Sequence, residues 1–254
     1  MTEVSERGGP QRIPRPEDWA IGGPPPWADL DDAASRIDAE RLQAAFEGRR
    51  GQESPVERDG GRAAAVLVPI HPGPDGGLHV VLTRRSDSLR HHTGEVSFPG
   101  GRVDPGETVV EAALREADEE VSLDPATVEV LGELDHLTTV TRRAYITPIV
   151  AWVPERPRLE PSEAEVAAIR HVPLRELLLP EVFREERWGR GATSRPVYFF
   201  ELVGDTVWGA TAAMLRQFLS IALDLDPGSR AQWDPAGDAL EAWDPPPGWE
   251  GRAV

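Results

Sequence analysis

The 254-residue chain contains no cysteine and no lysine, so all 27 of its permanently basic side chains are arginines. Without cysteine it can form no disulfide and perform no thiol chemistry. It also lacks a continuous apolar run near the ~18 residues of a membrane-spanning helix, and its first residues show no apolar signal segment. These absences favour a soluble cytoplasmic protein, and we take that location as an expectation.

Positive charge is scarce, because 44 acidic residues outnumber the arginines and give a net charge of −17. An acidic chain without a basic block is not expected to bind nucleic acids or anionic membranes in general. An anionic small molecule is still compatible with it, since metal ions and a few arginines can reverse the local sign of the potential. The composition therefore indicates a small-molecule partner, with no nucleic acid and no membrane.

Two Pro- and Gly-rich ends flank one region of regular patterning. Residues 1–59 are expected to form a flexible or polyproline-like arm followed by a short helix at 31–46. Residues 60–224 are expected to form one α+β domain, and residues 225–254 a tail. The tail carries Trp233, Trp243 and Trp249. These tryptophans would allow packing on the domain, contact with a partner or a homodimer.

Short apolar runs in the central region predict a mixed sheet, and 3.6-residue periods predict its helices. The predicted strands are residues 63–70, 78–83, 128–134, 137–140, 145–153, 167–172 and 196–202. The predicted helices begin at Thr108, Pro173 and Trp208. Loops are expected at 84–101 and 184–195.

The helix that begins at Thr108 has an unusual density of carboxylates near its end. Thr108 and Glu111 match a capping box, which sets its start. At about 100° per residue, one side is apolar and another is acidic. The apolar residues are Val110, Leu114, Ala117 and Val121, and the acidic residues are Glu116, Glu119 and Glu120. Like charges at this spacing repel and the helix end disfavours anions, so the pattern favours a binding site for Mg²⁺ or Mn²⁺, which prefer hard oxygen ligands.

The loop before this helix concentrates the opposite charge. Arg84, Arg85 and Arg90 are expected to face the acidic helix, and Gly100 and Gly101 would let the backbone approach a phosphate closely. Arginine makes bidentate contacts to phosphate. We therefore predict that Arg85 and Arg90 bind substrate phosphates, together with the two glycines.

The pattern from Gly101 through Glu107 to Arg115–Leu123 resembles the Nudix box, a 23-position motif from which only Ser122 departs, where glycine is usual. The resemblance implies a Nudix α/β/α sandwich with a loop-helix-loop motif, which hydrolyses nucleoside diphosphates linked to another group with Mg²⁺ or Mn²⁺. It implies metal-binding roles for Glu116, Glu119 and Glu120. Serine in the left-handed turn that glycine would make costs ~1 kcal/mol.

The same resemblance implies that Glu107 and Arg115 hold the loop against the helix. It leaves the general base open: Glu119 is one candidate, and Glu165 or its neighbour Glu163, in the later loop, is another. Glu116 is included in the predicted catalytic set with Glu119 and Glu165.

The stretch Val81–Ser86, Arg90 and Phe98–Gly101 is similar to the signature of the Nudix subfamily that hydrolyses coenzyme A. This implies cleavage of CoA or acyl-CoA to 3′,5′-ADP and 4′-phosphopantetheine or its acyl form. Two alternatives stay open at this point. One is a Nudix hydrolase of ADP-ribose, a dinucleotide or a nucleoside triphosphate, and the other is a non-catalytic, nucleotide-sensing Nudix module.

Overall fold

A computed structural model of the chain describes residues 7–11, 13–54, 62–86, 94–139, 144–191 and 194–227. Its strands are β1 (Trp19–Ile21), β2 (Arg62–Pro72), β3 (Leu78–Arg85), β4 (Val96–Ser97), β5 (Gly100–Arg102), β6 (Glu129–Glu133), β7 (Leu137–Thr138), β8 (Ala144–Trp152), β9 (Val166–Pro173), β10 (Phe183–Trp188), β11 (Arg195–Leu202) and β12 (Asp205–Trp208). Its helices are α1 (Ala39–Phe46), α2 (Val109–Val121), α3 (Leu174–Leu177) and α4 (Gly209–Ala222), with a 3₁₀ turn at Pro125–Thr127. In these ranges no helix has the length and apolarity that crossing a bilayer requires.

The strands form two sheets. The larger one has eight strands in the order β4-β3-β2-β8-β6, with β5 also paired to β2, β7 to β8 and β9 to β3. Strands β2 and β8 run parallel, whereas the other pairs in this sheet are antiparallel, so the sheet is mixed. The smaller sheet is antiparallel, in the order β1-β10-β11-β12.

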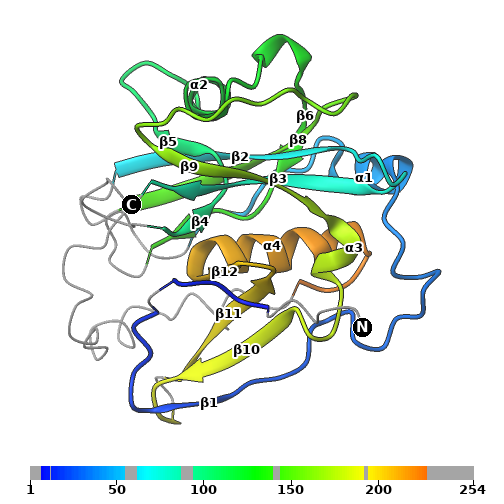
Figure 1. The fold of residues 1–254 in the computed structure, drawn as a ribbon, viewed down its shortest axis with the longest axis vertical. Helices are drawn as coiled ribbons and strands as arrows, with labels where there is room; N and C mark the ends of the chain where they lie inside the picture. The colour runs from blue at the N-terminus through cyan, green and yellow to red at the C-terminus, as the bar shows by residue number, and fades with distance from the viewer. Residues whose placement is uncertain are drawn as a thin grey trace.

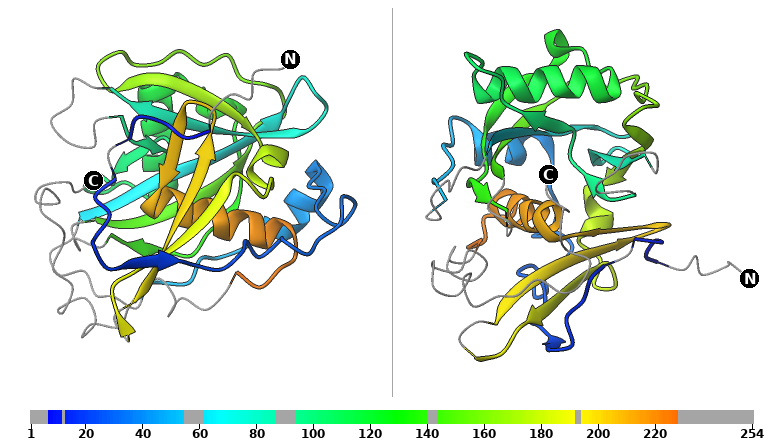
Figure 2. Two further views of the ribbon diagram at one scale, coloured as in Figure 1. Left: turned by 60° about the horizontal axis from the view of Figure 1, so that its bottom comes forward. Right: turned by 90° about the vertical axis from the view of Figure 1, so that its left-hand side faces the viewer.

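The elements stack in layers (Figures 1 and 2). Helix α2 covers one face of the eight-stranded sheet, and α4 lies between the opposite face and the four-stranded sheet. Successive side chains of a strand point to opposite faces of its sheet. In β2, Ala65 and Leu67 pack in the hydrophobic cluster under α2, and Val68 and Ile70 pack in the cluster around α4. The predicted α+β fold with a mixed sheet between helices is confirmed, and the smaller sheet adds a further layer.

The N-terminal segment is packed on the domain over its described part. Residues of β1 pair with β10, and Trp19 lies opposite Trp188. Trp27, which follows the polyproline run, is buried, with its ring 5.4 Å from that of Phe183. The described part of the segment expected to be a flexible or polyproline-like arm thus pairs with a strand and buries a large aromatic side chain.

The polar stretch predicted to be a loop at 184–195 forms most of β10 instead. Its charged residues are tolerated because Glu186, which is fully buried, is paired. The Arg15 Nε donates to it at 2.9 Å and the Trp188 indole donates to it at 2.7 Å, and Arg184 also pairs with it. A buried carboxylate with such partners can occupy a sheet, but sequence periodicity does not reveal the partners.

Candidate active site

Helix α2 begins and ends where its sequence predicts. The Thr108 hydroxyl accepts from the Glu111 N–H at 3.2 Å, and the Glu111 carboxylate accepts from the Thr108 N–H at 2.8 Å, which confirms the capping box. The helix ends at Val121 and is capped by Ser122, whose φ of 56° and ψ of 36° are left-handed. Serine thus occupies a conformation that glycine adopts with less strain.

The buried side of α2 is rotated relative to its prediction. Val110 and Leu114 are only half-buried, whereas Ala113 is fully buried and Glu120 is 3% exposed. Residues seven apart lie within about 20° of each other on a helix, so Glu120 shares the side of Ala113. The carboxylates are therefore not equivalent: Glu120 is held inside, while the side chain of Glu119 is 61% exposed.

Arg115 ties the start of the motif to the helix. Its Nε donates to Glu107 Oε1 at 2.9 Å and its Nη2 to Glu107 Oε2 at 3.0 Å, a bidentate pair. The same guanidinium donates to the Arg102 carbonyl at 3.0 Å and to Glu116 at 2.9 Å. Arg115 lowers the pKa of Glu107, chiefly through this hydrogen bonding. One side chain therefore sets the position of the loop and of one carboxylate at once.

Gly100 and Gly101 lie against the two inner carboxylates. The Gly100 N–H donates to Glu120 Oε2 at 3.2 Å. A Cβ placed on Gly101 would lie 2.4 Å from the Glu116 carboxylate carbon, so that carboxylate rests directly on the glycine. At Gly100 a Cβ would lie 2.4 Å from the Ala65 carbonyl oxygen of β2, and the φ of 155° is one that other residues rarely adopt. Both glycines are needed for close approach.

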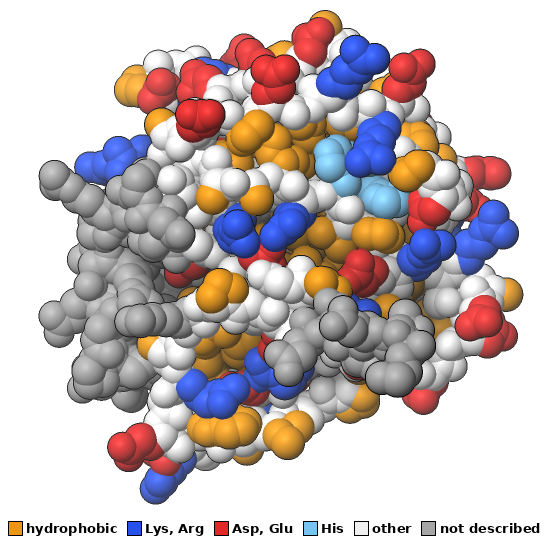
Figure 3. Space-filling view, in the orientation of Figure 1, with side chains coloured by type: hydrophobic (Ala, Val, Ile, Leu, Met, Phe, Trp, Pro, Cys, Tyr) orange, Lys and Arg blue, Asp and Glu red, His pale blue; other side chains and the backbone are white. Residues whose placement is uncertain are grey.

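Burial raises the pKa of Glu120 to about 7, an effect opposed by Arg85 and the Gly100 N–H and reinforced by Glu165 and Glu116. Burial also raises the pKa of Glu116, against the influence of Arg115. Burial disfavours the charged form of both carboxylates, and a nearby cation favours it. The electrostatics of this pair therefore suits a bound cation, and acidic side chains also gather along the edge of the molecule that carries α2 (Figure 3).

A divalent cation fits the chemistry of these donors. In the part of the chain that the structure describes, no group of three acidic or histidine side chains converges as a metal site. Glu119 turns instead toward Arg115, at 3.4 Å. Mg²⁺ typically takes one or two protein carboxylates and completes its octahedron with water and phosphate oxygens. Glu116 and Glu120 provide that number.

Arg84 and Arg85, which were predicted to lie in a loop, are the last residues of β3, and their side chains point to opposite sides of the sheet. Arg85 Nη1 lies 3.7 Å from Glu120, and Arg85 Nε is buried without a hydrogen-bond partner. Arg84 instead points to Asp205, at 3.4 Å, so the expectation that it faces the acidic helix was wrong. Consecutive residues of a strand point to opposite faces, and the β3–β9 register also shifts between these two arginines. Arg90, the other predicted phosphate ligand, lies outside the described residues.

Glu165 is brought to the site by a connection that the sequence does not signal. The Ser162 N–H donates to the Glu120 carbonyl at 2.9 Å and the Glu160 N–H to the Val121 carbonyl at 3.1 Å. These bonds attach the loop before β9 to the end of α2 and satisfy carbonyls that a helix terminus leaves free. Glu165 is exposed and acts electrostatically on both Glu116 and Glu120.

The sequence of the chain is similar to those of known proteins. A family model described as NUDIX domain matches residues 61–190, which is 130 of the 254 residues. The chain is 41% identical over 155 residues to the uncharacterized Nudix hydrolase NudL of Yersinia enterocolitica, covering 61% of this chain and 78% of that protein. It is also 41% identical over 168 residues to the NudL of Escherichia coli, covering 65% and 85%.

Among solved structures, a Nudix hydrolase from M. smegmatis, RenU, is 27% identical over 47% of this chain and 75% of that chain, with a TM-score of 0.38. The family assignment rests on the sequence matches instead. The motif from Gly101 to Leu123 lies inside the matched region, and the relatives are covered over more than three quarters of their length. The chain therefore belongs to the Nudix hydrolase family.

Proposed function

We propose that this pyrophosphohydrolase cleaves the diphosphate bond of coenzyme A or an acyl-CoA, releasing 3′,5′-ADP and 4′-phosphopantetheine or its acyl form. The observation that carries the proposal is the grouping of Glu116 and Glu120 over Gly100 and Gly101, with Arg85 beside them. It offers anionic ligands for a metal, a cation for phosphate and a backbone that a phosphate can approach.

In this proposal Glu116 and Glu120 hold Mg²⁺ or Mn²⁺. The bound cation would lower the pKa of a water and offset the charge of the diphosphate. Arg85, whose side chain is 29% exposed, contacts a phosphate oxygen with the accessible part of its guanidinium, and Gly100 and Gly101 leave room for that phosphate. Glu119, with its exposed side chain, is one candidate to accept the proton of the attacking water; Glu165 is the other.

The balance of the reaction is simple. Water adds to one phosphorus of the diphosphate, the bond from that phosphorus to the bridging oxygen breaks, and the proton of the water passes to a carboxylate. No oxidant or second substrate is needed. The choice of coenzyme A is supported by the similarity of residues 81–101 to the subfamily signature, of which the Arg85 and Gly100–Gly101 positions lie at the site.

A cytoplasmic location is part of the proposal, supported by the absence of cysteine. The homodimer and the role of the tail stay predictions, because Trp233, Trp243 and Trp249 lie outside the described residues. The domain limits at 60 and 224 stay predictions as well.

Product analysis tests the proposal. The purified chain is incubated with CoA and Mg²⁺ or Mn²⁺, and also with ADP-ribose and a dinucleotide. We expect 3′,5′-ADP from CoA. Faster cleavage of ADP-ribose than of CoA would contradict the substrate, and no turnover of any of these would contradict the activity.

A matched pair of variants tests the metal-binding role. Glu120→Gln removes a buried carboxylate, and we expect it to abolish hydrolysis while the chain stays folded. Asp118→Asn changes an exposed acid on the same helix and should keep wild-type activity. Near-normal turnover by Glu120→Gln with Mg²⁺ present would refute the assignment.

A further inference from the structure

Asp205, the first residue of β12, is a buried carboxylate that the proposed reaction does not use. It is 1% exposed. Arg170 Nε donates to its Oδ2 at 2.8 Å, and Arg84 Nη1 and Gln11 Nε2 donate to its Oδ1 at 3.4 and 3.0 Å. These donors come from β9, from β3 and from the N-terminal segment. A buried charge needs such partners, and here they join three distant parts of the chain.

Gln11 extends this network to β4. Its Nε2 also donates to the Gly94 carbonyl at 2.9 Å, and its Oε1 accepts from the Thr206 N–H at 2.9 Å. Gly94 lies two residues before β4. One amide side chain therefore links β12 to the segment that enters β4, with its donor and its acceptor both used.

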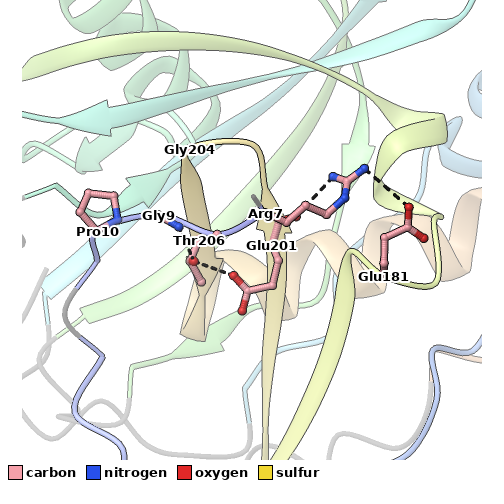
Figure 4. A pocket seen from close by; sticks show the side chains of 8 residues that line it. Arg7, Gly9, Pro10, Glu181, Glu201, Gly204 and Thr206 are labelled. Atoms are coloured by element: carbon pink, nitrogen blue, oxygen red, sulfur yellow. Dashed lines mark hydrogen bonds and ion pairs between the residues drawn. The ribbon is translucent and has the colours of Figure 1, made fainter. Parts of the chain in front are cut away.

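The segment that carries Gln11 is seated along β12 (Figure 4). The Gly9 N–H donates to Thr206 Oγ1 at 3.0 Å, and Thr206 Oγ1 donates to Glu201 at 2.6 Å. Arg7 pairs with Glu176 at 3.0 Å and with Glu181 at 3.7 Å. Arg7 thus holds the same segment as Gln11, and among the described residues its hydrogen bonds and ion pairs go to Glu176, Glu181 and the Glu201 carbonyl, not to Gly94.

Strand β4 has only two residues, so its position depends on what surrounds it. It pairs with the end of β3, where Arg84 lies opposite Val96 and the Arg85 N–H donates to the Glu95 carbonyl at 2.9 Å. Three residues after the end of β4 the chain reaches Gly100. The same short strand therefore separates Arg85 from the glycine backbone of the site.

We propose that Gln11 is a positioning residue: by tying Gly94 to β12, it sets the spacing between Arg85 and Gly100–Gly101 and so the affinity for the phosphate-bearing substrate. The substrate in this statement rests on the proposed function. The placement of β4 does not, and it can be measured without any substrate. If Gln11 served stability alone, loosening the segment at Arg7 would have the same consequences.

Two variants of the full-length chain separate these roles. Gln11→Met keeps the length of the side chain and removes its hydrogen bonds, and Arg7→Met releases the same segment elsewhere. With CoA and Mg²⁺, we expect Gln11→Met to raise KM about five-fold with kcat within a factor of two, and Arg7→Met to change neither. Gln11→Glu keeps the acceptor toward Thr206, loses the donor toward Gly94 and Asp205, and places a second carboxylate beside Asp205. It should raise KM at least as much as Gln11→Met does.

Hydrogen exchange without substrate gives the second measurement. We expect the peptide spanning residues 94–101 to exchange faster in Gln11→Met than in the wild type, and to be unchanged in Arg7→Met. If Gln11→Met and Arg7→Met behave alike in this peptide, the inference is overturned. If the wild type does not cleave CoA, the proposed substrate fails and the exchange result alone decides for or against Gln11.

Discussion

The two adjacent glycines of the site should fail in different ways when each is changed to alanine. In Gly101→Ala the new Cβ would lie 2.4 Å from the Glu116 carboxylate carbon and 2.5 Å from both of its oxygens. These atoms are the end of a flexible side chain, so Glu116 can rotate away. The fold should lose less than ~1 kcal/mol, the range of an ordinary surface change. The displaced carboxylate, however, no longer occupies its place at the site.

In Gly100→Ala the obstacle is the backbone. The Cβ would meet the Ala65 carbonyl oxygen at 2.4 Å and the Val66 Cα at 2.6 Å, and neither can rotate away. The φ of 155° adds conformational strain of about 1–3 kcal/mol, and overpacking adds about 1–3 kcal/mol. We expect a loss of about 2–6 kcal/mol, which lowers Tm by about 4–24 °C for a domain of this size.

Thermal unfolding and Mg²⁺ titration of activity distinguish the two variants. Gly101→Ala should keep nearly the wild-type Tm and need about 10–100-fold more Mg²⁺ for half-maximal rate, the range seen when support of a metal ligand is lost. Gly100→Ala should lower Tm, and this loss of stability should be its main effect. The reasoning is refuted if Gly101→Ala has the wild-type Mg²⁺ dependence, or if both variants lose the same stability.

Two further predictions concern stability. Ser122→Gly should raise the free energy of unfolding by about 1 kcal/mol, because it relieves the left-handed strain at the end of α2; urea denaturation measures it, and an unchanged or lower midpoint contradicts it. Burial lowers the pKa of His171 from 6.5 to about 4. Between these values the unfolded chain binds a proton that the folded chain does not, so stability should fall by about 1–2 kcal/mol as pH drops from 6.5 to 4, after allowance for partial exposure. His171→Gln should make this decline shallower in urea denaturation at each pH, and an identical slope would count against the assignment.

The ends of α2 could be predicted because their signals are local. A capping box needs only Thr108 and Glu111, and the left-handed end needs only the position of Ser122 in the motif. The buried side was predicted in part: Ala117 and Val121 are buried as expected, but the prediction included Val110 and Leu114 and omitted Ala112 and Ala113. Small side chains let a helix approach a sheet closely. Glu120 lies on the same side of α2 as Ala113 and is therefore buried with it.

Long-range pairing could not be predicted in the same way. Arg84 and Arg85 are adjacent residues of the same type, yet Arg84 pairs with Asp205 and Arg85 with Glu120. The partner of each depends on strands far along the chain. The place of Trp27 in the core is of the same kind, since its contacts with Phe183 and Phe200 join residues more than 150 positions apart.

The buried carboxylates of this lysine-free chain are all paired with arginine in the part that the structure describes. In the described part of the chain four acidic side chains are buried, and an arginine lies within 4 Å of each: Arg85 by Glu120, Arg49 by Asp135, Arg15 by Glu186 and Arg170 by Asp205. The planar guanidinium is less strongly hydrated than an ammonium group and matches a carboxylate with two donors, so it suits ion pairs in the interior.

These four pairs are not alike, and the difference supports the proposed site. In the pairs at Asp135, Glu186 and Asp205, the arginine nitrogen lies 2.5 to 2.8 Å from the carboxylate oxygen, as in a charge-assisted hydrogen bond. Arg85 stays 3.7 Å from Glu120, and of these four arginines it alone has a buried Nε without a partner. An unmet donor beside a buried carboxylate costs stability. A phosphate on the accessible part of the Arg85 guanidinium and a cation on Glu120 would give each charge a close partner, which the other three pairs already have.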